Sequence, residues 1–224
     1  MTIIIPLRCI LKSDSKEKTM SQSKKVRRLV LLSMFIGIEI VLMITPLGFV
    51  PIGPINATTL HIPVIIISIL LGTKEGVILG IVFGLSSIFT ATFRPTAFSF
   101  CFSPFYSIGE VHGNFSSILI AMVPRICIGL GSGYFYKLLR KKLSESPAIL
   151  ISAAAGSLIN TILVMSGIWL FFGREYAATA GFAYETFMNV IKATIFTNGI
   201  IEAILAAIIS AAVIKALKAK GAHI

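Results

Sequence analysis

Six long apolar segments alternate with short polar or Gly- and Pro-rich connections along the 224-residue chain. A membrane-spanning helix needs about 20 mostly apolar residues, with a range of about 17–25. Most of the segments reach that length, and the second and third are the shortest. We therefore predict an all-α integral membrane protein, a bundle of six transmembrane helices: Leu29–Thr45, Ala57–Leu71, Gly76–Ala91, Ser117–Leu139, Ala148–Phe172 and Phe187–Ile214.

The two ends of the chain are polar and basic, and they flank this apolar region. Residues 1–28 are interpreted as a basic cytoplasmic segment that need not be ordered, residues 29–214 as a single six-helix membrane domain, and residues 215–224 as a basic cytoplasmic tail. The tight turn Leu71–Gly76 predicts that the second and third segments form a helical hairpin.

Composition and charge agree with this picture. The chain is 56% hydrophobic and 13% charged, whereas soluble domains carry about 25% charged residues. Sixteen of the 20 Lys and Arg residues lie in the N-terminal segment, the turn Leu71–Gly76, the loop Lys137–Lys142 and the tail. The positive-inside rule places these segments, and with them both termini, in the cytoplasm. The net charge of +11 thus indicates orientation in a lipid bilayer, and we reject nucleic acid as a partner.

Two connections on the predicted outer side are unusual. Thr45–Pro63 is apolar but broken by four prolines and two glycines, so it predicts a lid over a cavity instead of a helix. Non-helical backbone at membrane depth needs protein or enclosed water to satisfy its polar groups. The aromatic-rich loop Thr92–Ser116 fits either a structured cap or an interfacial aromatic belt.

Polar residues inside the apolar segments are candidate site residues, because such groups are costly in a bilayer. At 1.5 Å per helical residue, they gather between the outer face and the midplane, which suits a ligand pocket that opens outward. They are Glu39, His61, Arg125, Asn160, Lys192, Asn198 and Glu202.

The chemistry of these side chains suggests roles. The Arg125 guanidinium could hold a ligand carboxylate or pair structurally with Glu202, which shares a helix face with Asn198. His61 could equally cap or fill its helix, and Arg94 could steer an anion or lie as a solvated interfacial charge. The predicted substrate-binding set is Asn56, His61, Arg94, Arg125, Asn160, Asn198 and Glu202.

Catalysis has little support. We find no GxxxxGK[ST] phosphate loop, HExxH, CxxC or recognisable Ser/His/Asp spacing. The three cysteines, Cys9, Cys101 and Cys127, are scattered and fit neither a disulfide framework nor a metal site. We therefore predict no catalytic and no metal-binding residues.

Several stretches, taken in order, resemble the S-components of energy-coupling factor (ECF) vitamin transporters. The first helix carries a small-xxx-small motif, Ser33 and Gly37, after a basic lead. The later stretches are PLGFVPIGPINATTLHIPVIIISILLGTKEGVILGIVFGLSS (Pro46–Ser87), PRICIGLGSGYFYKLLRK (Pro124–Lys141), GSLINTILV (Gly156–Val164) and NGIIEAILA (Asn198–Ala206). Pro46–Ser87 looks most like the pantothenate-specific branch of the family.

The resemblance implies a vitamin-binding subunit of a prokaryotic cell membrane, with no ATPase and no cofactor of its own. Its implied partners are a vitamin, a transmembrane coupling protein and two cytoplasmic ATPases that use ATP. Carried over, Ser33 and Gly37 become docking residues for the coupling protein, although on spacing alone they fit ordinary packing within the bundle.

Three other interpretations stay open from the residues. The chain could be an S-component for another vitamin, such as riboflavin or folate. It could be a stand-alone proton-coupled carrier with Glu202, Glu39 or Lys192 as relay, which would respond to a pH gradient without a partner. It could also be a structural membrane subunit, which no vitamin would stabilise against heat.

Overall fold

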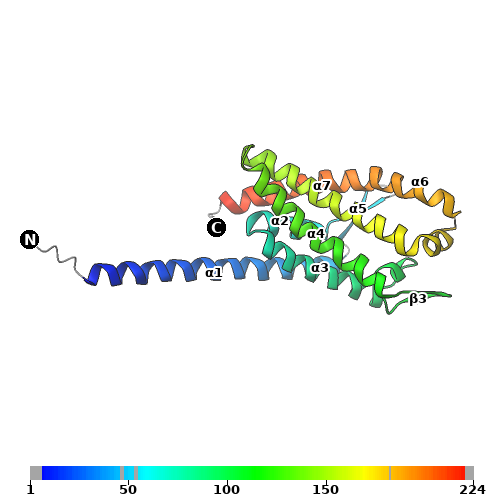
Figure 1. Ribbon diagram of the computed structural model, residues 1–224, viewed down its shortest axis with the longest axis horizontal. Helices are drawn as coiled ribbons and strands as arrows, with labels where there is room; N and C mark the ends of the chain where they lie inside the picture. The colour runs from blue at the N-terminus through cyan, green and yellow to red at the C-terminus, as the bar shows by residue number, and fades with distance from the viewer. Residues whose placement is uncertain (1–6, 46–47, 53–54, 182, 220–224) are drawn as a thin grey trace, which may run out of the picture.

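The computed structural model describes residues 7–45, 48–52, 55–181 and 183–219 (Figure 1). Helix α1 (Leu7–Ile44) leads into a hairpin of strands β1 (Phe49–Ile52) and β2 (Ile55–Thr58). The remaining elements are α2 (His61–Leu70), α3 (Thr73–Phe93), a 3₁₀ turn (Ser99–Cys101), β3 (Ser107–Ile108), β4 (Val111–His112), α4 (Phe115–Leu139), α5 (Glu145–Ala180), α6 (Tyr184–Thr194), a π-helical turn (Ile195–Gly199) and α7 (Ile200–Ala219).

The structure confirms that the chain is an all-α membrane protein, because most of its described residues lie in helices and several of these helices could cross a bilayer. Within the described residues, four helical stretches are long and apolar enough to cross a bilayer: α3, α4, α5 and the continuous rod Tyr184–Ala219. Helix α2 is apolar but has 10 residues. The predicted helical hairpin is also confirmed, because α2 ends at Leu70 and α3 begins at Thr73.

Some boundaries differ from the sequence predictions. Helix α1 begins at Leu7, so it runs through most of the segment that we separated as the N-terminal region. The fifth predicted segment ends at Phe172, whereas α5 continues to Ala180 beyond a kink at that residue (φ −135°, ψ 19°). Two short β-hairpins, β1–β2 and β3–β4, were not predicted.

The second of these hairpins belongs to the loop between α3 and α4, which is a structured cap. Phe100 and Cys101 are fully buried within it, and Phe100 packs edge-on against Phe172 of α5 with ring centroids 5.6 Å apart. Phe105, by contrast, is largely exposed, as in an aromatic belt. The interpretation as a structured cap is therefore confirmed, and the interfacial aromatic belt stays a prediction.

Helix α2 lies at the centre of the bundle. Nine of its residues, His61 to Ile69, are buried, and Val64, Ile65 and Ile67 have no exposed surface. A helix that is apolar on every side is expected in such a position. It contacts α3, α4, α5, α7 and α1, and so forms the core around which the other helices pack.

Helices α3 and α4 pack backbone against backbone through glycines. Gly76, Gly80 and Gly84 recur every four residues on α3, and a Cβ atom at Gly80 would lie 2.4 Å from the carbonyl oxygen of Arg125. A Cβ atom at Gly129 of α4 would lie 2.3 Å from the Gly76 backbone. Small residues permit such close approach in membrane bundles.

We expect the substitution Gly80→Ala to destabilise the protein by about 1–3 kcal/mol, because the new methyl group must displace backbone. This cost exceeds the gain of about 0.5–1 kcal/mol that alanine brings to a helix interior. Gly131→Ala is the matched control, since its methyl group would meet the flexible end of Ile159. Thermal unfolding of both variants in detergent checks this, and equal melting temperatures would contradict it.

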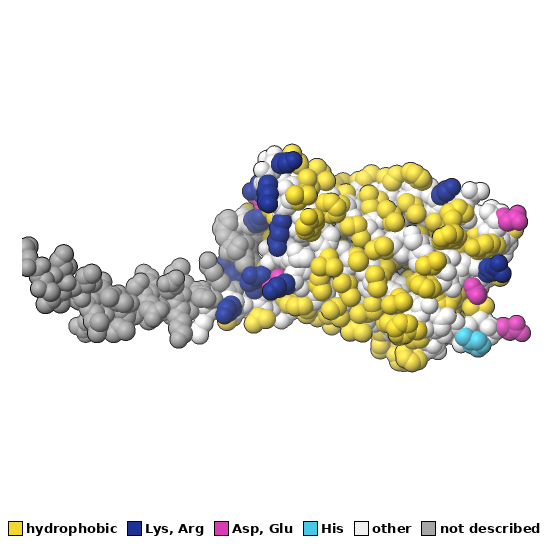
Figure 2. Space-filling view, viewed as in Figure 1, with side chains coloured by type: hydrophobic (Ala, Val, Ile, Leu, Met, Phe, Trp, Pro, Cys, Tyr) yellow, Lys and Arg dark blue, Asp and Glu magenta, His cyan; other side chains and the backbone are white. Residues whose placement is uncertain are grey.

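Charge divides the two ends of the bundle. Lys and Arg side chains gather at one end (Figure 2), which we call the basic end. The exposed basic residues of the α2–α3 turn, the α4–α5 region and the end of α7 are Lys74, Lys137, Arg140, Lys141, Lys142 and Lys215. The opposite end carries the β3–β4 hairpin and the α5–α6 connection, and we call it the loop end.

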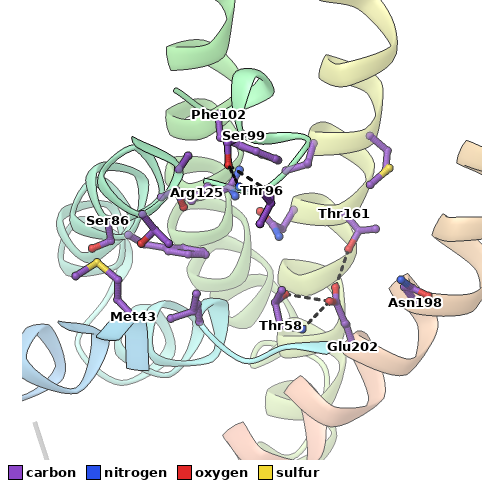
Figure 3. A pocket seen from close by; sticks show the side chains of 18 of the residues that line it. Met43, Thr58, Ser86, Thr96, Ser99, Phe102, Arg125, Thr161, Asn198 and Glu202 are labelled. Atoms are coloured by element: carbon purple, nitrogen blue, oxygen red, sulfur yellow. Dashed lines mark hydrogen bonds between the residues drawn. The ribbon is translucent and has the colours of Figure 1, made fainter. Parts of the chain in front are cut away.

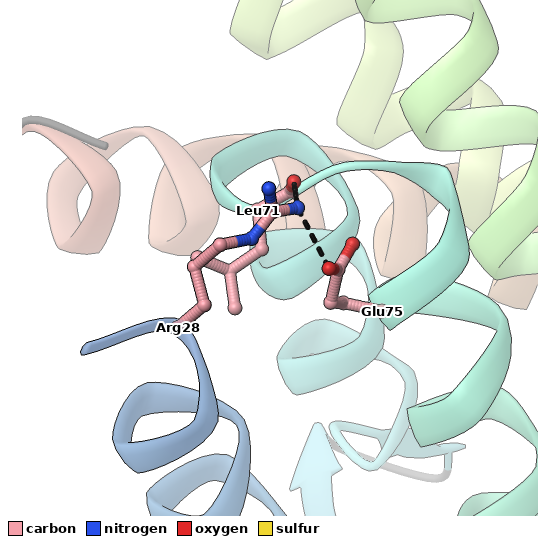
Figure 4. A network of polar contacts seen from close by, with 3 residues as sticks. All are labelled: Arg28, Leu71 and Glu75. Carbon is pink, nitrogen blue, oxygen red and sulfur yellow. Dashed lines mark hydrogen bonds and ion pairs between the residues drawn. The ribbon is translucent and has the colours of Figure 1, made fainter. Parts of the chain in front are cut away.

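An ion pair fixes α1 to the bundle near the basic end (Figure 4). The Arg28 guanidinium donates to the Leu71 carbonyl oxygen and to the Glu75 carboxylate, both at 2.6 Å. The Arg28 side chain is 40% exposed, so this ion pair contributes little to the free energy of unfolding. Its main effect is to hold α1 in a fixed orientation against the α2–α3 turn. A second pair, Lys218 with Glu145, joins the end of α7 to the start of α5.

Candidate ligand-binding site

A cavity of about 390 Å³ lies among α3, α4, α5 and the α6–α7 rod (Figure 3). Its lining includes Thr96, Ser99 and Phe102 of the α3–α4 loop, which places it toward the loop end. Small-molecule sites commonly have about 300–1,000 Å³. Three charged residues and two amides line it: Arg94, Arg125, Glu202, Asn160 and Asn198. The structure thus brings together five of the seven residues predicted for the substrate site.

A wall rich in hydroxyl groups completes the cavity, and none of its members belongs to the predicted substrate-binding set. Its members are Thr58, Ser86, Ser87, Thr90, Thr96, Ser99, Thr161 and Thr194. The spacing of Ser86, Thr90 and Arg94, four residues apart on one face of α3, was a signal that could have revealed part of this wall.

Arg125 is buried in the cavity wall, and the proline before it leaves a backbone carbonyl free to hold its side chain. Pro124 has no N–H group, so it cannot bond to the carbonyl of Ile120, four residues earlier. The Arg125 Nη1 atom donates to that Ile120 oxygen at 2.9 Å. The guanidinium carbon lies 5.2 Å from the ring centre of Phe83 and 5.3 Å from that of Phe102. A cation is therefore held between two aromatic faces.

This guanidinium has no counter-ion among the residues that the structure describes. Neither of the two ion pairs found there involves Arg125, and its Nε atom has no hydrogen-bond partner. With 8% of its surface exposed, it is a nearly desolvated positive charge. Such a charge is costly unless an anion meets it. The arrangement is what a site for a ligand carboxylate requires.

Glu202 does not pair with Arg125, so that structural alternative is wrong for the described structure. Its Oε1 atom accepts from the Thr58 backbone N–H and from the Thr58 hydroxyl, both at 2.9 Å. Its Oε2 atom accepts from the Thr161 hydroxyl at 3.4 Å. Glu202 therefore joins β2 and α5 to α7.

The two amides occupy different backbone settings. Asn160 is buried in α5, and its Oδ1 atom has no hydrogen-bond partner within the described part of the chain. Asn198 lies in the π-helical turn, one turn before Glu202 in the rod. Such widened turns often occur at functional sites. Asn160 and Asn198 can therefore both offer an amide to a ligand in the cavity.

The last three predicted residues, Arg94, His61 and Asn56, differ in where they lie. Arg94 is exposed at the cavity margin, and its Nη1 atom donates to the Ile44 carbonyl oxygen at 2.9 Å. His61 is buried at the start of α2 and is not part of the cavity lining. The backbone of Asn56 belongs to β2, but its side chain lies outside the described residues.

Helix α1 presents two different faces. Leu32, Phe35 and Glu39 are buried against the bundle, whereas Ser33 and Gly37 are exposed. A Cβ atom at Gly37 would meet nothing within 4 Å. The alternative that these small residues serve packing within the bundle is therefore wrong for Gly37. By contrast, the glycines Gly129 and Gly133 of α4 do pack closely against α2 and α3.

An apolar helical bundle with a cavity of this size, a buried arginine without a described counter-ion and many neutral polar groups is typical of a membrane protein that binds a small polar ligand. The family model for the substrate-specific component of ECF transporters matches residues 27–214. The chain belongs to this family, and so is the substrate-specific component of an ECF transporter.

Two curated relatives align with nearly the whole chain. The pantothenic acid transporter PanT of Lactococcus lactis subsp. cremoris (strain MG1363) is 35% identical over 199 residues, which cover 88% of this chain and 96% of that protein. The pantothenate transporter PanT of Leuconostoc mesenteroides subsp. mesenteroides is 27% identical over 199 residues, with 85% and 92% covered.

Proposed function

We propose that this protein captures pantothenate for uptake by an ECF transporter. The observation that carries the proposal is the buried Arg125 guanidinium, which faces the cavity without a described counter-ion. Pantothenate has one carboxylate, and one cation suffices to neutralise it. The names of the two relatives point to the same ligand.

The distribution of polar groups suggests how the ligand is oriented. The planar guanidinium of Arg125 presents donors in a fork that matches a carboxylate. Phe83 and Phe102 exclude water from this pair, which strengthens it. The Glu202 carboxylate would repel the ligand carboxylate, so the ligand's hydroxyls and amide are directed toward Asn160, Asn198 and the hydroxyl-rich wall.

The same proposal covers orientation in the membrane. Six spans with both termini in the cytoplasm would place the basic end inside and the loop end outside. The membrane domain would then be residues 29–214, flanked by the basic segments 1–28 and 215–224. The cavity lies toward the loop end, which supports capture of the ligand from outside.

Energy for uptake would come from partner proteins. The chain would bind no cofactor and hydrolyse no ATP, while a transmembrane coupling protein and two cytoplasmic ATPases drive transport. The exposed Ser33 and Gly37 of α1 offer a flat surface for the coupling protein, because small side chains let another helix approach closely.

Purified protein is expected to melt at a higher temperature with pantothenate than without it. A ligand at 100 times its dissociation constant stabilises by about 2.7 kcal/mol, which shifts a melting temperature by several degrees. Riboflavin and folate are the comparison vitamins, and pantothenol, with an alcohol in place of the carboxylate, is the matched control. Stabilisation by pantothenol equal to that by pantothenate would contradict the role given to Arg125.

A stand-alone carrier predicts a different result. Proteoliposomes that contain this chain alone would then accumulate pantothenate when a pH gradient is applied. We expect accumulation to need the energising module and ATP instead.

Stabilisation by riboflavin or folate without stabilisation by pantothenate would reassign the ligand within the same family.

A further inference from the structure

The carboxylate of Glu202 connects three elements that are far apart in the sequence. Thr58 ends β2, Thr161 lies in the middle of α5, and Glu202 lies in the first turn of α7 (Figure 3). Thr58 and Glu202 are separated by 144 residues in the chain. Both oxygens of the carboxylate are used in this way, Oε1 twice and Oε2 once.

These bonds join the end of β2 to the helical bundle. A two-stranded hairpin is marginally stable by itself, so β1–β2 needs support from the bundle. The hairpin base is closed by the bond from the Thr59 N–H to the Gly48 oxygen at 3.0 Å. Beyond that base, the Thr58 backbone N–H and hydroxyl reach across to α7. Hydrogen bonds to a charged acceptor are stronger than those between neutral groups.

The segment before the hairpin is anchored in a similar way. Arg94, at the end of α3, donates to the Ile44 oxygen at the end of α1. A charged side chain from another element therefore anchors the chain on each flank of the hairpin. Both of these side chains also line the cavity.

Glu202 is poorly suited to direct contact with an anionic ligand. Its Oε1 atom already accepts two hydrogen bonds from Thr58, its Oε2 atom shares the Thr161 hydroxyl proton with the Ser157 carbonyl oxygen, and the side chain is buried. Its negative charge would repel a ligand carboxylate at close range. The geometry instead fits a group that holds part of the cavity wall in place.

We propose that Glu202 is a positioning residue that fastens β2 to α5 and α7 and thereby slows the passage of ligand into and out of the cavity. Breaking the Thr58–Glu202 bonds frees the end of β2 from the cavity wall. The proposal rests on the proposed function for its ligand, pantothenate, but its structural part concerns the ligand-free protein.

The first test needs no ligand. Amide hydrogen exchange of Ile55–Thr58 is measured in the full-length protein in lipid nanodiscs. We expect exchange to rise on the order of tenfold in Glu202→Gln, because a neutral amide accepts more weakly than a carboxylate. Thr58→Val removes one of the two donors and is expected to show a smaller rise. Unchanged exchange in Glu202→Gln would overturn the proposal.

The double variant makes the test specific. If both residues act through one contact, Thr58→Val adds little to the effect of Glu202→Gln. Independent, additive effects would overturn the proposal. Thr179→Val is the matched control, because the Thr179 hydroxyl bonds within its own helix, to the Glu175 oxygen, and is exposed. It is expected to leave exchange in β2 unchanged.

The second test uses labelled pantothenate. In both Glu202→Gln and Thr58→Val, association and dissociation are expected to accelerate together, so that the dissociation constant changes less than either rate. A rise in dissociation alone, confined to Glu202→Gln, would make Glu202 a ligand contact and overturn the proposal. If the unaltered protein does not bind pantothenate, the proposed ligand is wrong, and the exchange experiment still decides the role of Glu202.

Discussion

Replacing Arg125 with methionine is expected to weaken pantothenate binding by about 30-fold to a few thousandfold. Truncating one partner of a buried charge pair costs about 2–5 kcal/mol, and each 1.4 kcal/mol is a factor of ten. Methionine keeps an unbranched apolar stem between Phe83 and Phe102, so the wall of the cavity stays filled. Isothermal titration calorimetry with pantothenate measures the loss.

The same substitution is expected to leave the ligand-free protein folded. Arg125→Met removes a hydrogen bond to Ile120 and two aromatic contacts, but it also removes a buried charge that has no described counter-ion. These effects oppose each other. If Arg125 had only a structural role, Arg125→Met would instead clearly lower the melting temperature, with no separate loss of affinity for pantothenate.

Two further variants sharpen this test. Arg125→Lys keeps the charge but loses the planar fork, so an intermediate affinity is expected. Arg174→Met removes an exposed arginine that lies over the Tyr184 ring and is not part of the cavity lining. It is expected to bind pantothenate as the unaltered protein does. Unchanged affinity in Arg125→Met would remove the basis of the proposed function.

Introducing leucine at Gly37 is expected to lower ATP-driven uptake at least tenfold while pantothenate binding stays intact. Gly37 is exposed on α1, and a Cβ atom there has no described neighbour within 4 Å. Leucine is also a better helix former than glycine, by less than the roughly 0.8–1 kcal/mol that separates glycine from alanine, so the substitution is not expected to destabilise α1. A bulky group can therefore interfere with a partner helix and with little else.

Uptake is measured in proteoliposomes that contain the complete transporter. Ser33→Leu is expected to act in the same direction, because Ser33 is exposed one helical turn earlier. Ile38→Leu conserves volume at an exposed position beside Gly37 and is the control. Normal uptake by Gly37→Leu would show that the coupling protein docks on another surface.

The four helical stretches that could cross a bilayer could be predicted because their apolar runs are long and end near turn or polar residues. The β1–β2 hairpin could not, since Pro51 lies within β1 and proline argues against a strand. The end of α5 after Phe172 was not predicted either. Gly173, Arg174 and Glu175 lower the hydropathy there, although the helix continues to Ala180.

The gathering of Arg125, Asn160, Asn198 and Glu202 follows from the cost of polar groups in lipid, which turns them toward the bundle interior. Their partners could not be foreseen, because Thr58 reaches Glu202 across 144 residues of chain. His61 shows the limit of the reasoning. Depth along the membrane places a residue at a level but does not fix helix rotation, and His61 faces the packed core.

The glycine contacts between α3 and α4 determine which parts of the protein can move. With the Gly80 position against the Arg125 carbonyl and the Gly129 position against the Gly76 backbone, no side chain separates the two helices there. Packed interfaces of this kind do not deform gradually. Sliding of α3 past α4 would force backbone atoms into collision, so α3 and α4 are expected to move together as one rigid unit. Relative motion of α3 and α4 is therefore not available for ligand entry and exit, and the part of the site that these two helices form, Phe83 and Arg125, is expected to keep its shape.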